Sequence, residues 1–239
     1  NETAIVYDTY NLLISEVIDA LENIIEAGYN YRFLQPNTIT DQNGNMTSVE
    51  FDTFGVVNKL IADGNGFGDT PEFPTEIYEY SVENYYLYQK PNFSHTMKYT
   101  EHCIIGQNAQ SGVADSRPKI ESFTYFSGTG QTVMQKIQSE TTIVTKQIDD
   151  IEVNFTYNWI GTGRTILNNK AKPVKQYEPY FSETSDYESE PIIVKQGVTP
   201  VLYYDPIGRL IRTDLPDGTF TKVEFTPWQQ KVYDPNDTV

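Results

Sequence analysis

Short runs of alternating apolar and polar residues, separated by turn-forming residues, make up most of this chain. The stretch Tyr203–Trp228 shows the pattern most clearly, because Arg209–Asp214 and Thr219–Phe225 are rich in residues that favour strands. Before each run lies a tight turn, at 205–208 and at 215–218, with Pro second and Gly fourth. We therefore predict a continuous ribbon of antiparallel strands here.

The same kind of turn recurs upstream. Residues 41–44 separate two strand-like runs, and 51–55 offers the same geometry again. Three segments, 126–131, 159–164 and 204–209, align without gaps as an aromatic residue, three turn residues, Gly, and then Gln or Arg. Such self-similarity indicates stacked supersecondary units. The residues that we expect to form these turns and repeats are Asp41, Gly44, Asp52, Gly55, Gly130, Gly163, Arg164, Tyr204, Asp205, Gly208, Arg209, Asp217 and Gly218.

Residues 11–27 are compatible with two structures. Apolar residues at Leu13, Val17, Leu21 and Ile24 form a helical stripe. The β-branched pairs and the absence of a helix cap favour two strands around a turn at 19–22 instead. The local pattern tilts toward strands and leaves the helix open.

Elsewhere the chain predicts an all-β fold, with consecutive antiparallel hairpins forming a curved sheet or spiral. We treat 1–239 as one fragment, with irregular loops in 1–118 and regular repeats in 119–239 as a further division. Strands are expected at 78–88 and 94–106 around a turn at 90–92, and irregular loops at 63–76, 107–118 and 182–191.

Charge and composition narrow the function. The chain has 17 Lys and Arg against 33 Asp and Glu, a net charge of −16, so a nucleic-acid surface is not expected. No apolar run is long enough to span a membrane. A single cysteine excludes an internal disulfide framework and a Cys-based zinc site. The chain starts without Met, and we expect it to be a segment of a longer protein.

Candidate catalytic and metal-binding groups are sparse. His95 and His102, with Cys103 beside the second, lie in a strand-like region where their side chains would point to opposite faces, so we favour a structural role. The run from Asp41 to Asp52 resembles a calcium loop, but Met46 replaces the required Gly, and a hairpin turn explains the same residues. No cofactor is expected.

Three further groups have ordinary explanations. Asp63–Gly66 and Asp149–Asp150 are weak calcium candidates, and the carboxylates at 183, 186 and 188 are expected to be solvated. The 18 Tyr and 12 Phe suit cross-strand packing, although such rings also line sugar-binding grooves. We predict no enzyme activity.

The turn at 204–210 resembles the YD repeat of the RHS family. The blocks YRFLQP (31–36) and TDQNGN (40–45), with the turn at 51–55, resemble the B component of insecticidal Tc toxin complexes and its SpvB-like relatives. Further blocks match in order at 123–140, 159–181 and 203–239. Departures are Glu22 where the relatives usually have Gly, and Val56 and Gln131 where they have Arg.

The resemblance implies a role. In that family the repeats wind into a β-sheet shell that encloses a toxic C-terminal segment until delivery, and the B component docks onto a pore-forming component. The chain would be a non-catalytic piece of that shell in a secreted bacterial virulence protein. Its partners would be other RHS-repeat segments, the enclosed toxic polypeptide and a pore-forming component. The resemblance also implies strands for 4–34. An extracellular adhesin or carbohydrate-binding β module is the alternative.

Overall fold

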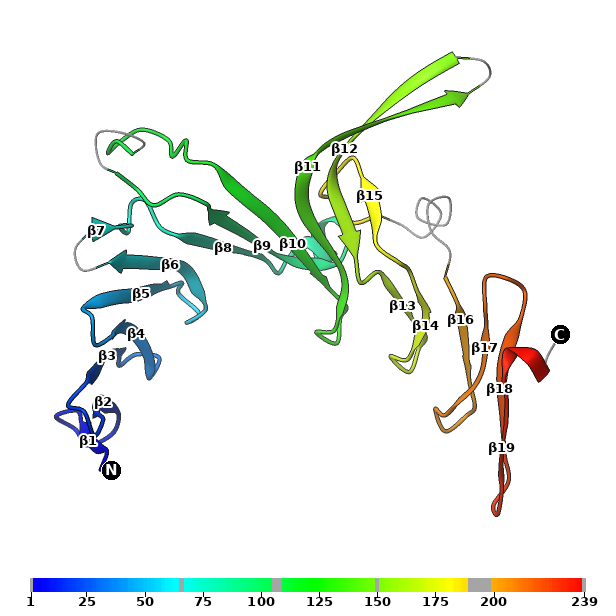
Figure 1. The fold of residues 1–239 in the computed structure, drawn as a ribbon, viewed down its shortest axis with the longest axis horizontal. Coiled ribbons are helices and arrows are strands. Elements are labelled where there is room, and N and C mark those ends of the chain that lie inside the picture. The colour runs from blue at the N-terminus through cyan, green and yellow to red at the C-terminus, as the bar shows by residue number, and fades with distance from the viewer. Residues whose placement is uncertain (1, 65–66, 105–108, 149–150, 189–198, 238–239) are drawn as a thin grey trace. The chain divides into compact units, whose positions relative to one another are not determined.

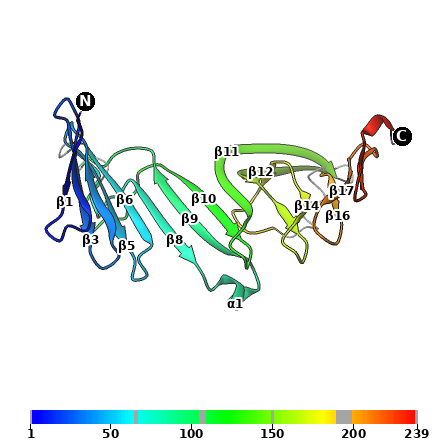
Figure 2. The same cartoon turned by 90° about the horizontal axis from the view of Figure 1, so that it is seen from below.

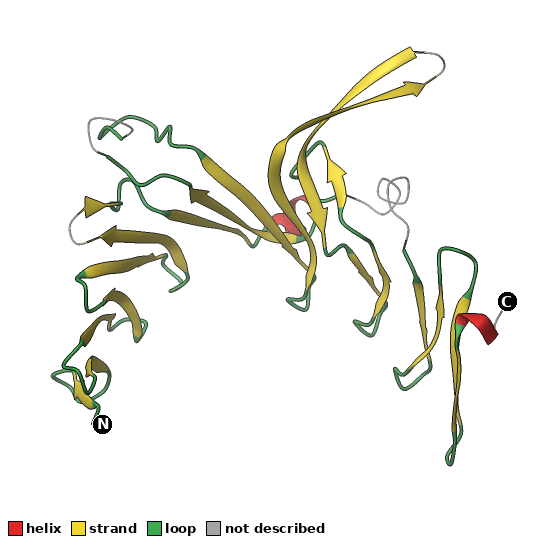
Figure 3. Cartoon of the chain, viewed as in Figure 1, coloured by secondary structure: helices red, strands yellow, loops and turns green. Residues whose placement is uncertain are grey.

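The computed structural model describes residues 2–64, 67–104, 109–148, 151–188 and 199–237. Within these residues the chain consists of antiparallel strands with one short α-helix and one 3-10 turn (Figures 1 and 3). The all-β prediction is therefore confirmed. Backbone contacts divide the chain into two compact units, one made of Asn1–Glu79 and His95–Glu121, the other of Tyr80–Ser94 and Ser122–Val239.

Thirteen of the described strands form one hydrogen-bonded sheet, in which most neighbours in sequence are neighbours in the sheet. The strand order is β1-β2-β3-β4-β5-β6-β8-β9-β10-β11-β12-β15, with β7 added to β6. Figure 2 shows β1, β3, β5 and β6 side by side in chain order. The strands are β1 (Ala4–Tyr7), β2 (Ile14–Ile18), β3 (Ile24–Asn30), β4 (Gln35–Thr40), β5 (Asn45–Phe51), β6 (Val57–Gly64), β7 (Phe67–Gly68), β8 (Glu76–Ser81), β9 (Asn92–Tyr99), β10 (Lys119–Phe126), β11 (Thr132–Ile148), β12 (Ile151–Thr162) and β15 (Tyr180–Ser182).

A second sheet of six described strands follows the order β13-β14-β16-β17-β18-β19. It contains the ribbon from which the sequence pattern was first read, since β16, β17 and β18 pair in succession. The strands are β13 (Thr165–Leu167), β14 (Pro173–Gln176), β16 (Val201–Tyr204), β17 (Leu210–Asp214), β18 (Phe220–Phe225) and β19 (Gln230–Tyr233), and the 3-10 turn η1 (Pro235–Asp237) follows.

Residues 11–27 form strands and not a helix. β2 and β3 pair in antiparallel register, with Val17 opposite Ile25, and the turn between them is at 19–22. The apolar stripe at helical spacing does not produce a helix, because in strands these β-branched residues gain cross-strand partners on both sides.

Two predicted strands are shorter than expected. The strand expected at 78–88 ends at Ser81, and α1 (Asn84–Tyr88) follows, because Asn84 donates to the Pro91 carbonyl and Asn92 accepts from the Tyr85 N–H. The strand expected at 94–106 ends at Tyr99. Residues 100–104 lie beyond the strand, where the Cys103 N–H donates to the Asp69 carboxylate, and 105–106 lie outside the described residues.

The loop expected at 63–76 is interrupted by short strand structure. β6 continues to Gly64, and β7 adds the pair Gly64 with Phe67. Gly68 fits there because a Cβ would come within 2.7 Å of the Ala62 carbonyl oxygen. The calcium candidate at 63–66 is therefore half inside a strand, and its residues 65–66, like Asp149–Asp150, lie outside the described residues.

Burial differs along the first sheet. No residue of β1 to β5 is buried. Buried apolar residues gather instead around Phe73 with Cys103 in the first unit, and around Tyr125 with Met134 in the second. Large apolar side chains such as Leu21 and Phe54 stay exposed on the early strands. These strands are therefore held by backbone pairing and partial side-chain contact, without a packed second layer over them.

Candidate functional site

The hairpins share one turn with a fixed set of hydrogen bonds. In the copy at 205–209, the Gly208 N–H donates to the Asp205 carbonyl and the Asp205 N–H to the Arg209 carbonyl. The Asp205 carboxylate accepts from the Ile207 and Arg209 N–H groups, and Gly208 has φ of 89°. A register shift follows in the adjoining strand pair, which is the bulge expected after such a turn.

Most of the predicted turn residues occupy the same places in their own copies. Asp41 and Asp52 accept two backbone N–H bonds each, and Gly44, Gly55, Gly130 and Gly218 all have positive φ. A side-chain bond from Asn45, together with two backbone bonds, lowers the pKa of Asp41. Its carboxylate oxygens thus accept the hydrogen bonds that close the turn.

Two further copies of the turn occur, one at 19–22, where the strand alternative placed it, and one at 168–172, which was not predicted. At 19–23 the Asp19 carboxylate accepts from Leu21 and Asn23, and Glu22 takes the left-handed position with φ of 64°. At 168–172 the acceptor is Asn168, and Ala171 has φ of 56°. Both lack Gly where the prediction required it. An Asp or Asn acceptor between two strand-like runs was the remaining signal.

The segment at 159–164 does not form the predicted hairpin turn. Residues 159–162 belong to β12, which pairs with β15, and Gly163 and Arg164 connect β12 to β13. Gly163, the aligned residue, keeps a positive φ of 63°, and Gly161 is needed because a Cβ there would come within 2.7 Å of the Tyr180 ring. The hairpin prediction failed because β12 continues to pair with β11 up to Thr162, and the chain then enters β13 of the second sheet.

The turn at 127–131 contains two glycines that differ in backbone conformation. Gly130 has φ of 79°, in the left-handed region, and Gly128 lies outside that region. A Cβ at either position meets nothing within 4 Å. We expect Gly130→Ala to lower the free energy of unfolding by about 1 kcal/mol. Gly128→Ala should leave it within about 0.5 kcal/mol or raise it. Chemical denaturation of both variants tests this, and equal effects would contradict the assignment of Gly130 as the strained position.

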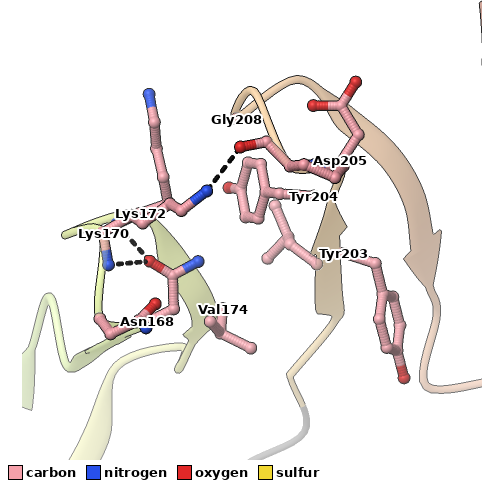
Figure 4. A pocket seen from close by; sticks show the side chains of 11 residues that line it. Asn168, Lys170, Lys172, Val174, Tyr203, Tyr204, Asp205 and Gly208 are labelled. Atoms are coloured by element: carbon pink, nitrogen blue, oxygen red, sulfur yellow. Dashed lines mark hydrogen bonds between the residues drawn. The ribbon is translucent and has the colours of Figure 1, made fainter.

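A hollow of about 370 Å³ separates the turns at 168–172 and 205–209 (Figure 4). Lys170 spans it by donating from Nζ to the Pro206 carbonyl. The Tyr204 hydroxyl donates to the Pro173 carbonyl at 2.8 Å. These bonds connect neighbouring hairpins of the second sheet, so the polar groups here serve the fold.

A buried arginine organises the irregular loops of the first unit. All five donors of Arg117 find acceptors: Nε and Nη2 contact the Asp115 carboxylate, Nη1 contacts Asp69 at 2.9 Å, and the carbonyls of Glu101 and Pro74 take the rest. The Tyr99 ring centre lies 4.3 Å from the guanidinium carbon. The side chains of Arg117 and Asp69 are 0% and 1% exposed. One cation thus connects the loop between β7 and β8 with the loop between β9 and β10.

Asp69 is the second centre of this cluster. Its Oδ1 also accepts from the Cys103 N–H at 2.7 Å, and its Oδ2 accepts from the Thr75 hydroxyl and contacts Nδ1 of His102. Burial would raise its pKa, but the hydrogen bonds and Arg117 outweigh burial and lower it. Burial also raises the pKa of the Cys103 thiol, which is opposite to the change that activates a nucleophile.

These carboxylates predict acid sensitivity. The pKa of Asp115 is lowered from 3.8 because its bonds to Arg117 outweigh burial, and the pKa of Asp69 is lowered chiefly by the hydrogen bonds from Thr75 and Cys103. The stability they contribute is complete above the unfolded value and is lost as pH falls through the folded values. We expect the free energy of unfolding to fall below about pH 4. In the Asp69→Asn variant, the free energy of unfolding should decrease less steeply with falling pH, as measured by denaturation curves at several pH values. An equally steep decrease in the variant and the unchanged chain would contradict this.

His95 lies between two glutamates of neighbouring strands. Nδ1 is 3.0 Å from a Glu79 carboxylate oxygen, and Nε2 is 2.8 Å from Glu121. Burial would raise the pKa of Glu121, but Lys119 and His95 outweigh it and lower the value. His95 and His102 thus belong to separate clusters, although not as opposite faces of one strand, because β9 ends at Tyr99 and His102 lies in the loop after it. Among the described residues no group of three or more His, Cys, Asp or Glu is placed to hold a metal ion.

The second unit contains a buried lysine. Lys136 on β11 is fully covered and donates to Glu188 Oε2 at 2.8 Å, while the Ser182 hydroxyl donates to Glu188 Oε1 at 2.6 Å. Burial lowers the pKa of Lys136, and the contact with Glu188 offsets part of this. The expectation that Glu188 is solvated was therefore wrong. It is drawn inward because the buried ammonium has to be paired.

Comparisons with known proteins agree with the fold. The chain is similar to the crystal structure of TcdB2-TccC3 with a TM-score of 0.77 and 22% identity, covering 98% of this chain and 12% of that chain. It is also similar to a Photorhabdus luminescens Tc holotoxin pore structure, with a TM-score of 0.74, 18% identity and coverage of 98% and 14%. No family model and no curated protein sequence matches the chain.

The chain therefore has the fold of a Tc toxin-like protein, and the resemblance predicted from the sequence blocks is confirmed at the level of the fold. It spans between 12% and 15% of the chains that it matches. Among the described residues no helix is long and apolar enough to cross a membrane.

Proposed function

We propose that this chain is a non-catalytic wall segment of a secreted toxin-complex protein, part of a β-sheet shell that encloses and helps deliver a toxic C-terminal domain. The observation that carries the proposal is the first sheet, in which β1 to β5 contain no buried residue. Domains ordinarily bury a sheet against a second layer. A sheet without one is suited to be a partition between two spaces.

The hairpin turns support the same role. Each turn adds one strand to the sheet and satisfies its own backbone groups through an Asp, Asn or Ser side chain. A wall can therefore be lengthened hairpin by hairpin while leaving only its two terminal edges unpaired. The buried clusters at Arg117 and Lys136 fix the places where loops interrupt this regular pattern.

The fold comparison supports the toxin setting. The chain matches part of a TcdB2-TccC3 structure described as lacking a hypervariable C-terminal region, at a TM-score of 0.73 and 18% identity. The partners that we propose are other repeat segments of the shell, the enclosed toxic polypeptide and a pore-forming component. The buried Cys103 thiol, with its raised pKa, is poorly suited to act as a nucleophile, which supports a non-catalytic role.

Limited proteolysis of the longer protein tests the wall function. The C-terminal toxic segment should resist protease in the intact protein and be degraded when it is expressed alone. Deletion of residues 120–228 should remove the protection. A variant with Tyr86→Ala, which changes only an exposed side chain, should keep it. Protection that survives the deletion would overturn the proposal.

A further inference from the structure

The short helix α1 presents three tyrosine side chains to the solvent. The side chains of Tyr85, Tyr86 and Tyr88 are all more than half exposed, and the helix has no buried residue. Gln89 ends it in the left-handed conformation, with φ of 55°. A non-glycine residue costs about 1 kcal/mol or more in this conformation, so the local structure is maintained against strain. Exposed apolar groups of this kind mark interaction sites.

Two hollows of the second unit adjoin at this helix. The larger has a volume of about 580 Å³ and lies between Tyr85, Phe126 and Tyr187. The smaller, of about 250 Å³, lies between Tyr88, Phe93 and Tyr187. Tyr187 lines both hollows, whereas Lys90 and Asp186 line only the smaller one. The larger hollow forms the cleft beside α1. The larger hollow alone is within the size range of small-ligand sites.

The lining of the larger hollow selects the ligand chemistry. It combines aromatic rings with the amides of Gln89 and Asn92 and the Ser127 hydroxyl, and no charged residue lines it. Without a cation, and in a chain of net charge −16, it does not suit an anion. Without a carboxylate it does not suit a cation. A neutral ligand with hydroxyl groups and an apolar face fits this combination. Saccharides have both properties.

The groups are held in place before a ligand arrives. The guanidinium carbon of Arg164 lies 4.8 Å from the centre of the Tyr187 ring, and the Tyr125 ring lies 5.6 Å away. Asn92 is fixed through Oδ1, which accepts from the Tyr85 N–H, and Gln89 is fixed through Nε2, which donates to the Tyr85 carbonyl. Both amides keep a second polar atom for a ligand. Such preorganisation reduces the entropic cost of binding.

We propose that the cleft beside α1 binds a neutral oligosaccharide, with Tyr85 as the exposed stacking ring, Tyr187 as the fixed wall, and the amides of Gln89 and Asn92 as hydrogen-bonding groups. This binding site is independent of the wall function, since it uses one surface of the second unit and no strand edge.

Titration of the 239-residue chain with neutral oligomers of glucose, galactose and N-acetylglucosamine tests the proposal, by calorimetry and saturation-transfer NMR. At least one series should bind. Tyr85→Ala should weaken that binding about fivefold to tenfold. Tyr86→Ala is the matched control, because Tyr86 is on the same helix, is 84% exposed and lines neither hollow. It should bind as the unchanged chain does.

A second variant separates binding from folding. Gln89→Gly removes the amide but relieves the left-handed strain, so it should weaken binding while leaving the unfolding midpoint equal or higher. The absence of binding by all three series at about 10 mM would overturn the proposal, since weaker association is below what such a cleft provides. Equal weakening by Tyr85→Ala and Tyr86→Ala, or unchanged binding in Gln89→Gly, would also overturn it.

Discussion

Replacement of Arg117 by Met is expected to lower the free energy of unfolding by about 3–5 kcal/mol, because it leaves two buried carboxylates without their cation. Asp69 and Asp115 both contact the guanidinium, at 2.9 and 2.8 Å. Two backbone carbonyls would lose their donors at the same time. Urea denaturation, monitored by tryptophan and tyrosine fluorescence, measures the change.

Arg212→Met is the matched control. Arg212 also pairs with an aspartate and also lies over an aromatic ring, but its side chain is 43% exposed. Exposed pairs contribute about 0–1 kcal/mol, so this variant should remain close to the unchanged chain. Adding Asp69→Asn to Arg117→Met should recover part of the loss, because it removes one unpaired charge. Equal losses from Arg117→Met and Arg212→Met would contradict the cluster as described.

Local turn chemistry made much of this fold predictable. The turn at 205–209 depends on Asp205 and Gly208. Every group that they hydrogen-bond within the turn is at most four positions away in the sequence. Such short-range patterns can be recognised in sequence. Prediction failed at 159–164, where pairing with β11 and with β15, a strand further along the chain, extends β12 to Thr162. It failed again at Asn84–Tyr88, where side-chain bonds across a loop decide the structure.

The buried ion pairs of Arg117 and Lys136 could not be predicted from such short-range patterns. Arg117 contacts Asp69, 48 positions away, and Lys136 contacts Glu188, 52 positions away. The acidic composition around Glu188 indicates a solvated loop, and only the tertiary position of Lys136 reverses that interpretation. The partners of a buried charge depend on which strands and loops become neighbours, and that information is in the topology of the sheet.

The clusters also explain how a thin sheet tolerates interruptions. Where β1 to β5 run without long loops, short turns suffice and no buried charge is found among their described residues. Where loops intervene after β7 and after β15, a buried cation anchors each of them. In a sheet with little core, ion pairs and hydrogen bonds provide the specific loop positions that core packing provides elsewhere.

Replacement of Lys136 by Met is expected to lower the free energy of unfolding by about 3 kcal/mol, through the unpaired charge left on Glu188. The Lys136 side chain is fully buried and that of Glu188 is 12% exposed, so little water reaches the carboxylate. Met fills a similar volume, which limits any loss from a cavity. Chemical denaturation gives the value, with Lys222→Met as the control, because Lys222 and Glu224 are both more than 40% exposed. That control should lose about 1 kcal/mol or less.

A double variant separates charge from packing. Adding Glu188→Gln to Lys136→Met removes the unpaired charge and keeps a group that accepts from the Ser182 hydroxyl. If the loss comes from the buried charge, the double variant should regain at least half of it. If the loss comes from packing around the lysine stem, the double variant should stay as unstable as Lys136→Met alone. The second result would mean that Glu188 is not the group that makes burial of Lys136 tolerable, and that the loop after β15 is anchored by other contacts.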